Sequence, residues 1–235
     1  MEYFRKRNSV NSRPPSSKLR ECAAIEVNGL TKKFRQRVVV DGATFIAPAG
    51  AITCIVGRNG SGKSTTLKML VGLIRPTTGS ATIGGVRYDS FKDPTREVGV
   101  VLCNSNFVGS LSVGRHLKQI AISSNARPER VLELSIELGI DQYMNHKIDS
   151  LSTGVRRRFE FACALANDPR VLLLDEPTSG LDAAGLDWFY EFISRSLDQK
   201  ITILMVTHRA DEVKNFSCRT ITIANGTITG IEDTK

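Results

Sequence analysis

The stretch that decides the fold is Gly57-Arg58-Asn59-Gly60-Ser61-Gly62-Lys63-Ser64. It fits the phosphate-loop pattern of Gly, any four residues, Gly, Lys and Ser or Thr. The glycines permit backbone angles that a Cβ would forbid, so that successive N–H groups can turn toward phosphate oxygens. Lys63 is a point cation that can reach the β- and γ-phosphates, and the Ser64 hydroxyl can bind Mg²⁺. With Thr65 after them, these residues predict a nucleotide site; a Gly-rich turn without a nucleotide is the alternative.

The segments on either side of this loop have the secondary structure that a phosphate loop requires. Ala51–Val56 is a short apolar run, which indicates a buried strand directly before the loop. After the loop, apolar residues recur at helical spacing, at Leu67, Leu70, Val71 and Ile74. A helix that starts here points its partly positive end at the bound anion. The order of strand, loop and helix predicts the core of a P-loop NTPase.

Length, charge and cysteine usage limit the class of protein. The chain has 235 residues, of which 41% are hydrophobic, enough for one large domain or a domain with a subdomain. The formal net charge is +8, but residues 1–20 hold six Lys or Arg residues against one acid. The rest of the chain therefore gives no strong sign of nucleic-acid binding. Five cysteines without a Cys-x-x-Cys pair indicate reduced thiols in the cytosol rather than disulfides or a zinc site.

The chain divides into a polar start and an α/β body with a helical insertion. Residues 1–22 predict a disordered basic tail, with a membrane-surface or nucleic-acid arm as the alternative. No apolar run approaches membrane-spanning length, and the N-terminus lacks the apolar core of a secretory signal. Residues 23–235 are predicted to form one domain, with a helical subdomain inserted at about 104–167. Within it, the pattern is helical from about Ser110 to Gly139, a predicted C-cap.

The expected fold class is α/β: a P-loop NTPase core with a parallel central sheet, an N-terminal antiparallel β edge and the inserted helical subdomain. Three apolar runs suit parallel strands that are covered on both faces. These runs are Val98–Leu102, Val171–Leu174 and Ile201–Val206. The antiparallel edge is assigned to Ala24–Val27, which Asn28-Gly29 is expected to break, and to Val38–Ile46.

Asp175 and Glu176 end one apolar run and are candidate metal-binding and acid–base residues. Strand alternation cannot bury both side chains, so they should project from the carboxyl end of the strand, where ligands bind in open α/β sheets. Asp175 can hold Mg²⁺ directly or through water, and Glu176 is then placed to accept a proton from an attacking water. A salt-bridged acid pair at a strand end is the structural alternative.

Four ordered motifs make the chain resemble the ATP-binding cassette (ABC) ATPases from about Ile25 to Gly230. The first motif is the phosphate loop. Leu151-Ser152-Thr153-Gly154-Val155-Arg156-Arg157-Arg158 is similar to the signature motif of the family. Asp175-Glu176-Pro177-Thr178-Ser179-Gly180-Leu181-Asp182 resembles its Walker B segment, catalytic Glu and D-loop, and His208 falls at its switch histidine.

The resemblance implies that two such domains sandwich two ATP molecules head to tail. Ser152 and the Gly154 backbone of one subunit would bind the γ-phosphate held by the phosphate loop of the other, as suits a helix N-terminus. Glu176 would polarise the attacking water, and His208 would contact the γ-phosphate in the transition state. Asp182 would cross the dimer interface.

Three positions need comment against the family pattern. Phe34 stands where the family places an aromatic residue that stacks on adenine, although a core or edge-strand Phe is the alternative. Thr153 and Val155 replace the first Gly and the Gln of the usual signature, whereas Ser152 and Gly154 remain.

Cys103 takes the place of a Gln that, in the family, touches Mg²⁺ and senses the membrane partner. A thiol is a poor ligand for a hard cation. The next residue, Asn104, would supply an amide oxygen only if the loop shifted by one residue. We therefore place Cys103 at the nucleotide and expect slow hydrolysis or altered coupling.

The resemblance implies the ATPase subunit of a membrane transporter, using ATP and Mg²⁺ as a homodimer or heterodimer and powering a separate integral-membrane permease. Phe107 and Val108 lie where the family contacts its permease. Arg156-Arg157-Arg158 and the compact length look most like bacterial export-type cassettes for drugs, peptides or surface polymers. Such a subunit is expected in the cytoplasm, peripheral on the inner face of the membrane, without a nucleic-acid partner. The alternatives are a soluble ABC ATPase of translation or DNA repair, and a weakly hydrolysing regulatory module.

Overall fold

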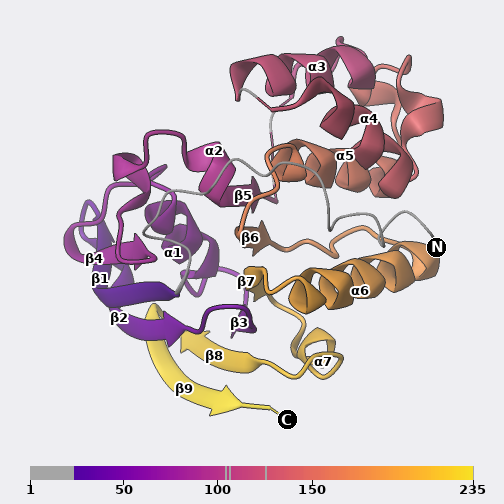
Figure 1. Cartoon of the computed structure of the whole chain (residues 1–235). Coiled ribbons are helices and arrows are strands. Elements are labelled where there is room, and N and C mark those ends of the chain that lie inside the picture. The colour runs from indigo at the N-terminus through magenta and orange to yellow at the C-terminus, as the bar shows by residue number, and fades with distance from the viewer. Residues whose placement is uncertain (1–23, 104, 106, 125, 235) are drawn as a thin grey trace.

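The computed structural model describes residues 24–103, 105, 107–124 and 126–234. Figure 1 shows a strand-rich region that contains both sheets and, above it, a separate group of helices. The predicted tail, residues 1–22, and Asn104 lie outside the described residues.

Six strands form the central sheet in the order β5-β6-β7-β3-β8-β9. Their bounds are β3 Ile52–Val56, β5 Val98–Val101, β6 Val171–Asp175, β7 Thr202–Thr207, β8 Arg219–Ala224 and β9 Thr227–Asp233. All neighbouring pairs are parallel except β8 and β9. Every residue of β3, β6 and β7 is buried, which is why these strands read as continuous apolar runs. Because they are parallel, their carboxyl ends meet at one edge of the sheet.

The predicted antiparallel unit is a three-stranded sheet of its own, in the order β2-β1-β4. Its strands are β1 Ile25–Phe34, β2 Arg37–Ala47 and β4 Thr78–Ile83. The expected break at Asn28-Gly29 is wrong. The register shifts between Val27 and Leu30, where Gly29 adopts a φ of +58°, so a bulge forms and β1 continues.

Seven α-helices occur in the described residues. They are α1 Lys63–Leu70, α2 Pro94–Glu97, α3 Val113–Ser123, α4 Pro128–Glu137, α5 Thr153–Leu165, α6 Ala183–Asp198 and α7 Ala210–Val213. Three 3₁₀ turns occupy Tyr88–Ser90, Asp141–Tyr143 and Ile148–Ser150. The stretch predicted to be helical before Gly139 holds two helices, α3 and α4, and Gly139 follows α4 at a φ of +62°. With α5 they form the helical group of Figure 1, between β5 and β6 in the sequence; the subdomain bounds stay a prediction.

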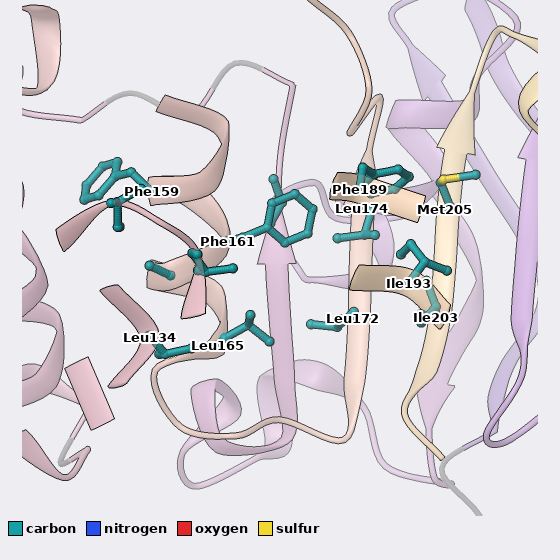
Figure 2. Packing of buried hydrophobic residues seen from close by; sticks show 14 of the residues in the cluster. Leu134, Phe159, Phe161, Leu165, Leu172, Leu174, Phe189, Ile193, Ile203 and Met205 are labelled. Carbon is teal, nitrogen blue, oxygen red and sulfur yellow. The ribbon is translucent and has the colours of Figure 1, made fainter. Parts of the chain in front are cut away.

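Alternating residues of the central sheet feed two hydrophobic clusters, one on each face. Leu172 and Leu174 of β6 belong to the cluster packed against the helices, whereas Val171 and Leu173 belong to the cluster shared with the antiparallel sheet and α1. Figure 2 shows the first cluster, with labelled side chains from α4, α5, β6, α6 and β7. The predicted α/β class is confirmed. Among the described residues, no helix has the length and apolar character needed to cross a bilayer.

Candidate functional site

The phosphate loop follows β3 and leads directly into α1. Gly60 and Gly62 adopt φ values of +80° and +105°, which only glycine reaches without a Cβ penalty. A Cβ on Gly57 would lie 2.2 Å from the carbonyl oxygen of Ile223, so β8 approaches too closely for a side chain. No side chain caps α1, and its first turn holds no acid. The buried Ser61 hydroxyl has no hydrogen-bond partner among the described residues. These features fit a phosphate oxygen as the partner of the loop.

Lys63 is the buried cation of the loop. Its ammonium donates hydrogen bonds to the carbonyl oxygens of Gly57 at 2.8 Å and Arg58 at 3.1 Å. Burial lowers the pKa of Lys63, whereas the charges of Glu176 and Asp175 oppose that shift. The ammonium therefore lies among partial and full negative charges, the surroundings that a phosphate group would also provide.

Ser64 and Asp175 join the start of α1 to the end of β6. The Ser64 hydroxyl donates to Asp175 Oδ1 at 2.8 Å. Asp175 is 2% exposed, and burial raises the pKa of its carboxyl group, although the hydrogen bond from Ser64 opposes the rise. Two side-chain oxygens that could bind a metal ion thus lie next to each other beside the phosphate loop. An oxygen-only set of this kind fits Mg²⁺.

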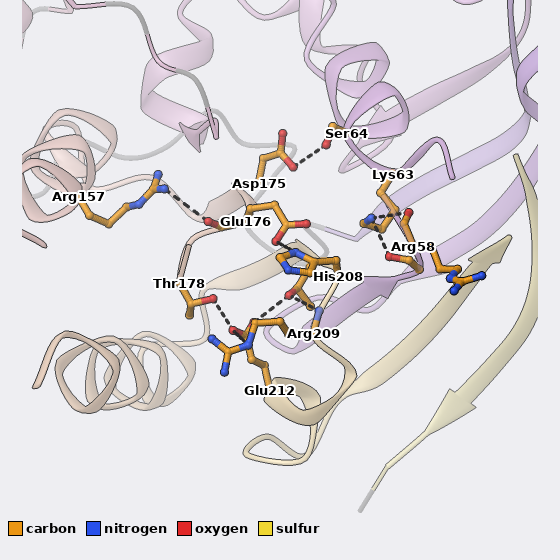
Figure 3. A network of polar contacts seen from close by, with 12 residues as sticks. Arg58, Lys63, Ser64, Arg157, Asp175, Glu176, Thr178, His208, Arg209 and Glu212 are labelled. Carbon is orange, nitrogen blue, oxygen red and sulfur yellow. Dashed lines mark hydrogen bonds and ion pairs between the residues drawn. The ribbon is translucent and has the colours of Figure 1, made fainter. Parts of the chain in front are cut away.

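The second contact that involves an acidic residue of the site joins Glu176 to His208. His208 Nδ1 lies 2.7 Å from Glu176 Oε2. Glu176 has a φ of +50°, a left-handed conformation that is uncommon for a residue with a Cβ. This change of backbone direction explains how two consecutive acids at a strand end avoid pointing to opposite faces. Figure 3 shows the Glu176 carboxylate next to His208 and on the side of Lys63.

A cleft of about 420 Å³ brings these groups together. The predicted residues that line it are Asn59, Gly60, Gly62, Lys63, Ser64, Thr65, Cys103, Asp175, Glu176 and His208. Four lining residues were missed by the sequence analysis, namely Val39, Lys68, Leu102 and Ser179. The signal for Lys68 was present, because it follows Ser64 by four positions on α1 and so shares its face. The approach of Val39, from β2, follows only from tertiary packing.

Ser152, Gly154 and Asp182 do not line this cleft. Ser152 caps α5, with its hydroxyl accepting from the Val155 N–H at 3.4 Å. Asp182 caps α6, with Oδ1 accepting from the Gly185 N–H at 2.8 Å. Both caps are exposed. Within one chain, the turn at residues 152–154, called the signature turn below, and the phosphate loop are therefore separate surfaces.

Phe34 also lies outside the cleft. It ends β1 and is 45% exposed, and the Lys32 ammonium lies 4.9 Å from its ring centroid. The ring is therefore an exposed strand-end aromatic rather than a core residue. Its contact with adenine stays a prediction.

Cys103 lines the cleft with an exposed thiol. Partial burial raises the pKa of this thiol, with Asp175 adding to the rise and Arg157 opposing it. The thiol therefore stays protonated at neutral pH and offers no anionic ligand. The candidate oxygen ligands in the cleft remain those of Ser64 and Asp175.

Comparison with known proteins places these features in context. The family model described as "ABC transporter" matches residues 40–179. A probable multidrug ABC transporter ATP-binding protein, YbhF of Escherichia coli K12, is 32% identical over 195 residues, covering 81% of this chain and 34% of the relative. The Nod factor export ATP-binding protein I of Burkholderia lata is 34% identical over 212 residues, covering 87% and 69%. A solved dimeric cassette of a bacterial ABC transporter superposes with a TM-score of 0.81 at 24% identity, covering 90% and 99%. This chain thus spans about a third of the length of YbhF.

Proposed function

Because the chain belongs to the ABC transporter family, we propose that it is an ATP-binding and ATP-hydrolysing subunit that dimerises around ATP and powers a membrane permease. The observation that carries this proposal is the meeting, in one cleft, of Lys63, the Ser64–Asp175 pair and the Glu176–His208 pair. These groups come from α1 and from the ends of β6 and β7. The parallel sheet brings them to one edge.

ATP binding is assigned to the phosphate loop and the first turn of α1. The loop amides and Lys63 would neutralise the phosphate charge. Mg²⁺ would bind through Ser64 and Asp175, whose oxygens already lie 2.8 Å apart. Bound there, Mg²⁺ would supply positive charge against that of the phosphate groups. Phe34 remains the candidate for adenine, and Cys103, which lines the cleft, would lie near the bound Mg²⁺.

Hydrolysis is assigned to Glu176 and His208. The carboxylate contacts His208 through Oε2, which leaves Oε1 to accept a proton from the attacking water. The histidine contacts Glu176 through Nδ1, which leaves Nε2 for the γ-phosphate. Lys63 adds a fixed positive charge at the developing transition state.

A second subunit, identical or different, is proposed to complete the ATP site. Ser152 is the N-cap of α5, a helix of 13 residues whose first turn contains Gly154, and neither residue lines the cleft of its own chain. A Cβ on Gly154 would meet no atom within 4 Å, so this turn is open to a ligand held elsewhere. Asp182 is exposed and follows Asp175 and Glu176 closely in the sequence. It would contact the partner across the interface.

The membrane partner is proposed to be the permease of an exporter of drug, peptide or surface polymer. The names of YbhF and the Nod factor protein refer to multidrug transport and export, which supports an export-type subunit. Val108 is 59% exposed before α3 and available to a permease, whereas the ring of Phe107 packs 5.0 Å from that of Phe159. The subunit would lie in the cytoplasm, peripheral on the inner face of the membrane. A weakly hydrolysing regulatory module is the second candidate, favoured only by Cys103.

The replacement Glu176→Gln tests the proposal most directly. The variant should bind ATP as the wild type does, lose at least about 10²-fold in turnover because the general base is gone, and accumulate as an ATP-bound dimer. Turnover, ATP binding and size-exclusion profiles measure these outcomes. Glu191→Gln, at an exposed acid of α6 away from the cleft, is the matched control and should match the wild type. A Glu176→Gln protein that hydrolyses ATP at the wild-type rate would overturn the assignment.

A further inference from the structure

Glu212 is a buried carboxylate beside the proposed ATP cleft, and the proposed function assigns it no role. It lies in α7 and is 1% exposed. Its Oε1 accepts a hydrogen bond from the Thr178 hydroxyl at 2.5 Å, and its Oε2 accepts one from the Thr207 hydroxyl at 2.8 Å. Arg209 Nε, 3.2 Å from Oε1, supplies a compensating positive charge. Because a buried carboxylate is costly unless it is paired and hydrogen-bonded, these partners explain how Glu212 remains inside.

The two threonines belong to the two turns that carry the hydrolytic candidates. Thr178 follows Glu176 by two positions in the turn after β6. Thr207 ends β7 and immediately precedes His208. One carboxylate therefore joins the two turns on which Glu176 and His208 depend for their position. Figure 3 shows the contact between Thr178 and Glu212 beside the Glu176–His208 pair.

The backbone of Glu176 needs such support. Its φ of +50° is sparsely populated for a residue with a Cβ, and such conformations persist only where the surroundings hold them. The Glu176 N–H donates to the Val206 carbonyl at 2.8 Å, which holds the start of the turn. The hydrogen bond from Thr178 to Glu212 holds its far side.

We propose that Glu212 is a positioning residue for ATP hydrolysis, which keeps Glu176 and His208 in contact by holding Thr178 and Thr207 on one carboxylate. This inference rests on the proposed function. A displacement of about 1 Å in a reacting group can lower a rate by about 10²-fold. The groups assigned to ATP binding lie on the loop and α1, whereas His208 is assigned to the hydrolytic step, so ATP affinity should not depend on Glu212.

A role in fold stability alone makes a different prediction. Loss of a purely structural contact lowers the melting temperature, while the molecules that remain folded turn over ATP at the wild-type rate. A positioning role instead lowers kcat and leaves KM for ATP unchanged. The hydroxyl of Thr178 separates the two roles, because Val has the same shape without the hydroxyl and Ser keeps the hydroxyl without the methyl group.

The experiment compares Glu212→Gln, Thr178→Val and Thr178→Ser in the full chain with Mg²⁺ and ATP. We expect Glu212→Gln and Thr178→Val to lower kcat by about 10- to 100-fold with KM within about twofold, and Thr178→Ser to recover most of the turnover lost in Thr178→Val. Thr53→Val is the matched control, because the Thr53 hydroxyl is buried in β3 and has no partner among the described residues. It should match the wild type. Unchanged kcat in Thr178→Val, or an equal loss in Thr178→Ser, would overturn the proposal.

Hydrogen–deuterium exchange provides a readout that does not require turnover. Without nucleotide, Glu212→Gln and Thr178→Val should speed amide exchange in residues 176–179 and 207–209, whereas Thr178→Ser and Thr53→Val should not. Unchanged exchange in these two turns would overturn the role of Glu212 even if the wild type hydrolyses ATP. A wild-type chain that neither binds nor hydrolyses ATP would overturn the proposed function, whatever the exchange shows.

Discussion

The cleft around the phosphate loop and the signature turn differ in how many of their interaction partners lie within the same chain. The first brings together a buried lysine, two acids and a histidine from distant parts of the sequence. The second is the exposed start of α5, where the Ser152 hydroxyl accepts a hydrogen bond from the Val155 N–H of its own helix. The charged groups of a buried site need partners within the fold, whereas the free N–H groups of an exposed helix N-terminus can bind an anion supplied by another molecule. The difference supports the proposal that a second subunit completes the site.

Replacement of Ser152 should give the largest effect on this comparison. Ser152→Ala should lower ATP turnover by about 10²-fold, the cost of losing one donor to a developing charge, and should prevent dimer formation in a Glu176→Gln background. ATP binding by the monomer should not change. Ser112→Ala is the matched control, because Ser112 caps α3 in the same way, accepting from the Arg115 N–H at 3.3 Å. Both changes should cost about 1 kcal/mol of stability as lost N-caps. Equal turnover in the two variants would contradict a role for Ser152 beyond capping.

Variants of Cys103 test whether this position in the cleft affects Mg²⁺ binding. Cys103→Gln adds an amide oxygen beside Ser64 and Asp175, so the Mg²⁺ concentration for half-maximal turnover should fall by about tenfold. Cys103→Ala removes the thiol without adding an oxygen and should not lower it. The measurement is turnover against Mg²⁺ concentration at fixed ATP. No difference between the Gln and Ala variants would remove Cys103 from the metal side of the cleft.

Asp175 should give the smallest effect, measured as a melting temperature without nucleotide or Mg²⁺. Burial raises the pKa of Asp175 in the folded state above its ordinary value of 3.8, so the folded protein binds this proton more tightly than the unfolded chain. The ionised carboxylate therefore destabilises the fold above the raised pKa, and this cost disappears below 3.8. Asp175→Asn should melt higher than the wild type at pH 7, with a difference that shrinks as pH falls. A difference that grows as pH falls would show that the ionised form is the favoured one.

Local patterns predicted the parts of the molecule whose chemistry is contiguous in sequence. The glycine spacing around Lys63 and the apolar run before Asp175 each contain their own structural signal, and the predicted family and α/β fold are confirmed. The expected break at Asn28-Gly29 is wrong. A glycine that ends a strand and a glycine in a β-bulge cannot be told apart in the sequence, because the bulge is defined by the pairing strand. Glu212 was not singled out at all. Its partner Thr178 lies 34 positions away, and a Glu in a short polar helix gives no sign of burial.

By itself, the sequence predicted which residues would serve phosphate, metal and acid–base chemistry, and it indicated the order of strands and helices that present them, because backbone freedom and apolar periodicity are local properties. Tertiary structure alone decided that Ser64 meets Asp175, that Glu176 turns toward His208, and that the signature turn stays apart from them. These distances depend on how strands far apart in sequence align in one sheet. That alignment is set by the burial of both sheet faces, which no short stretch of sequence contains.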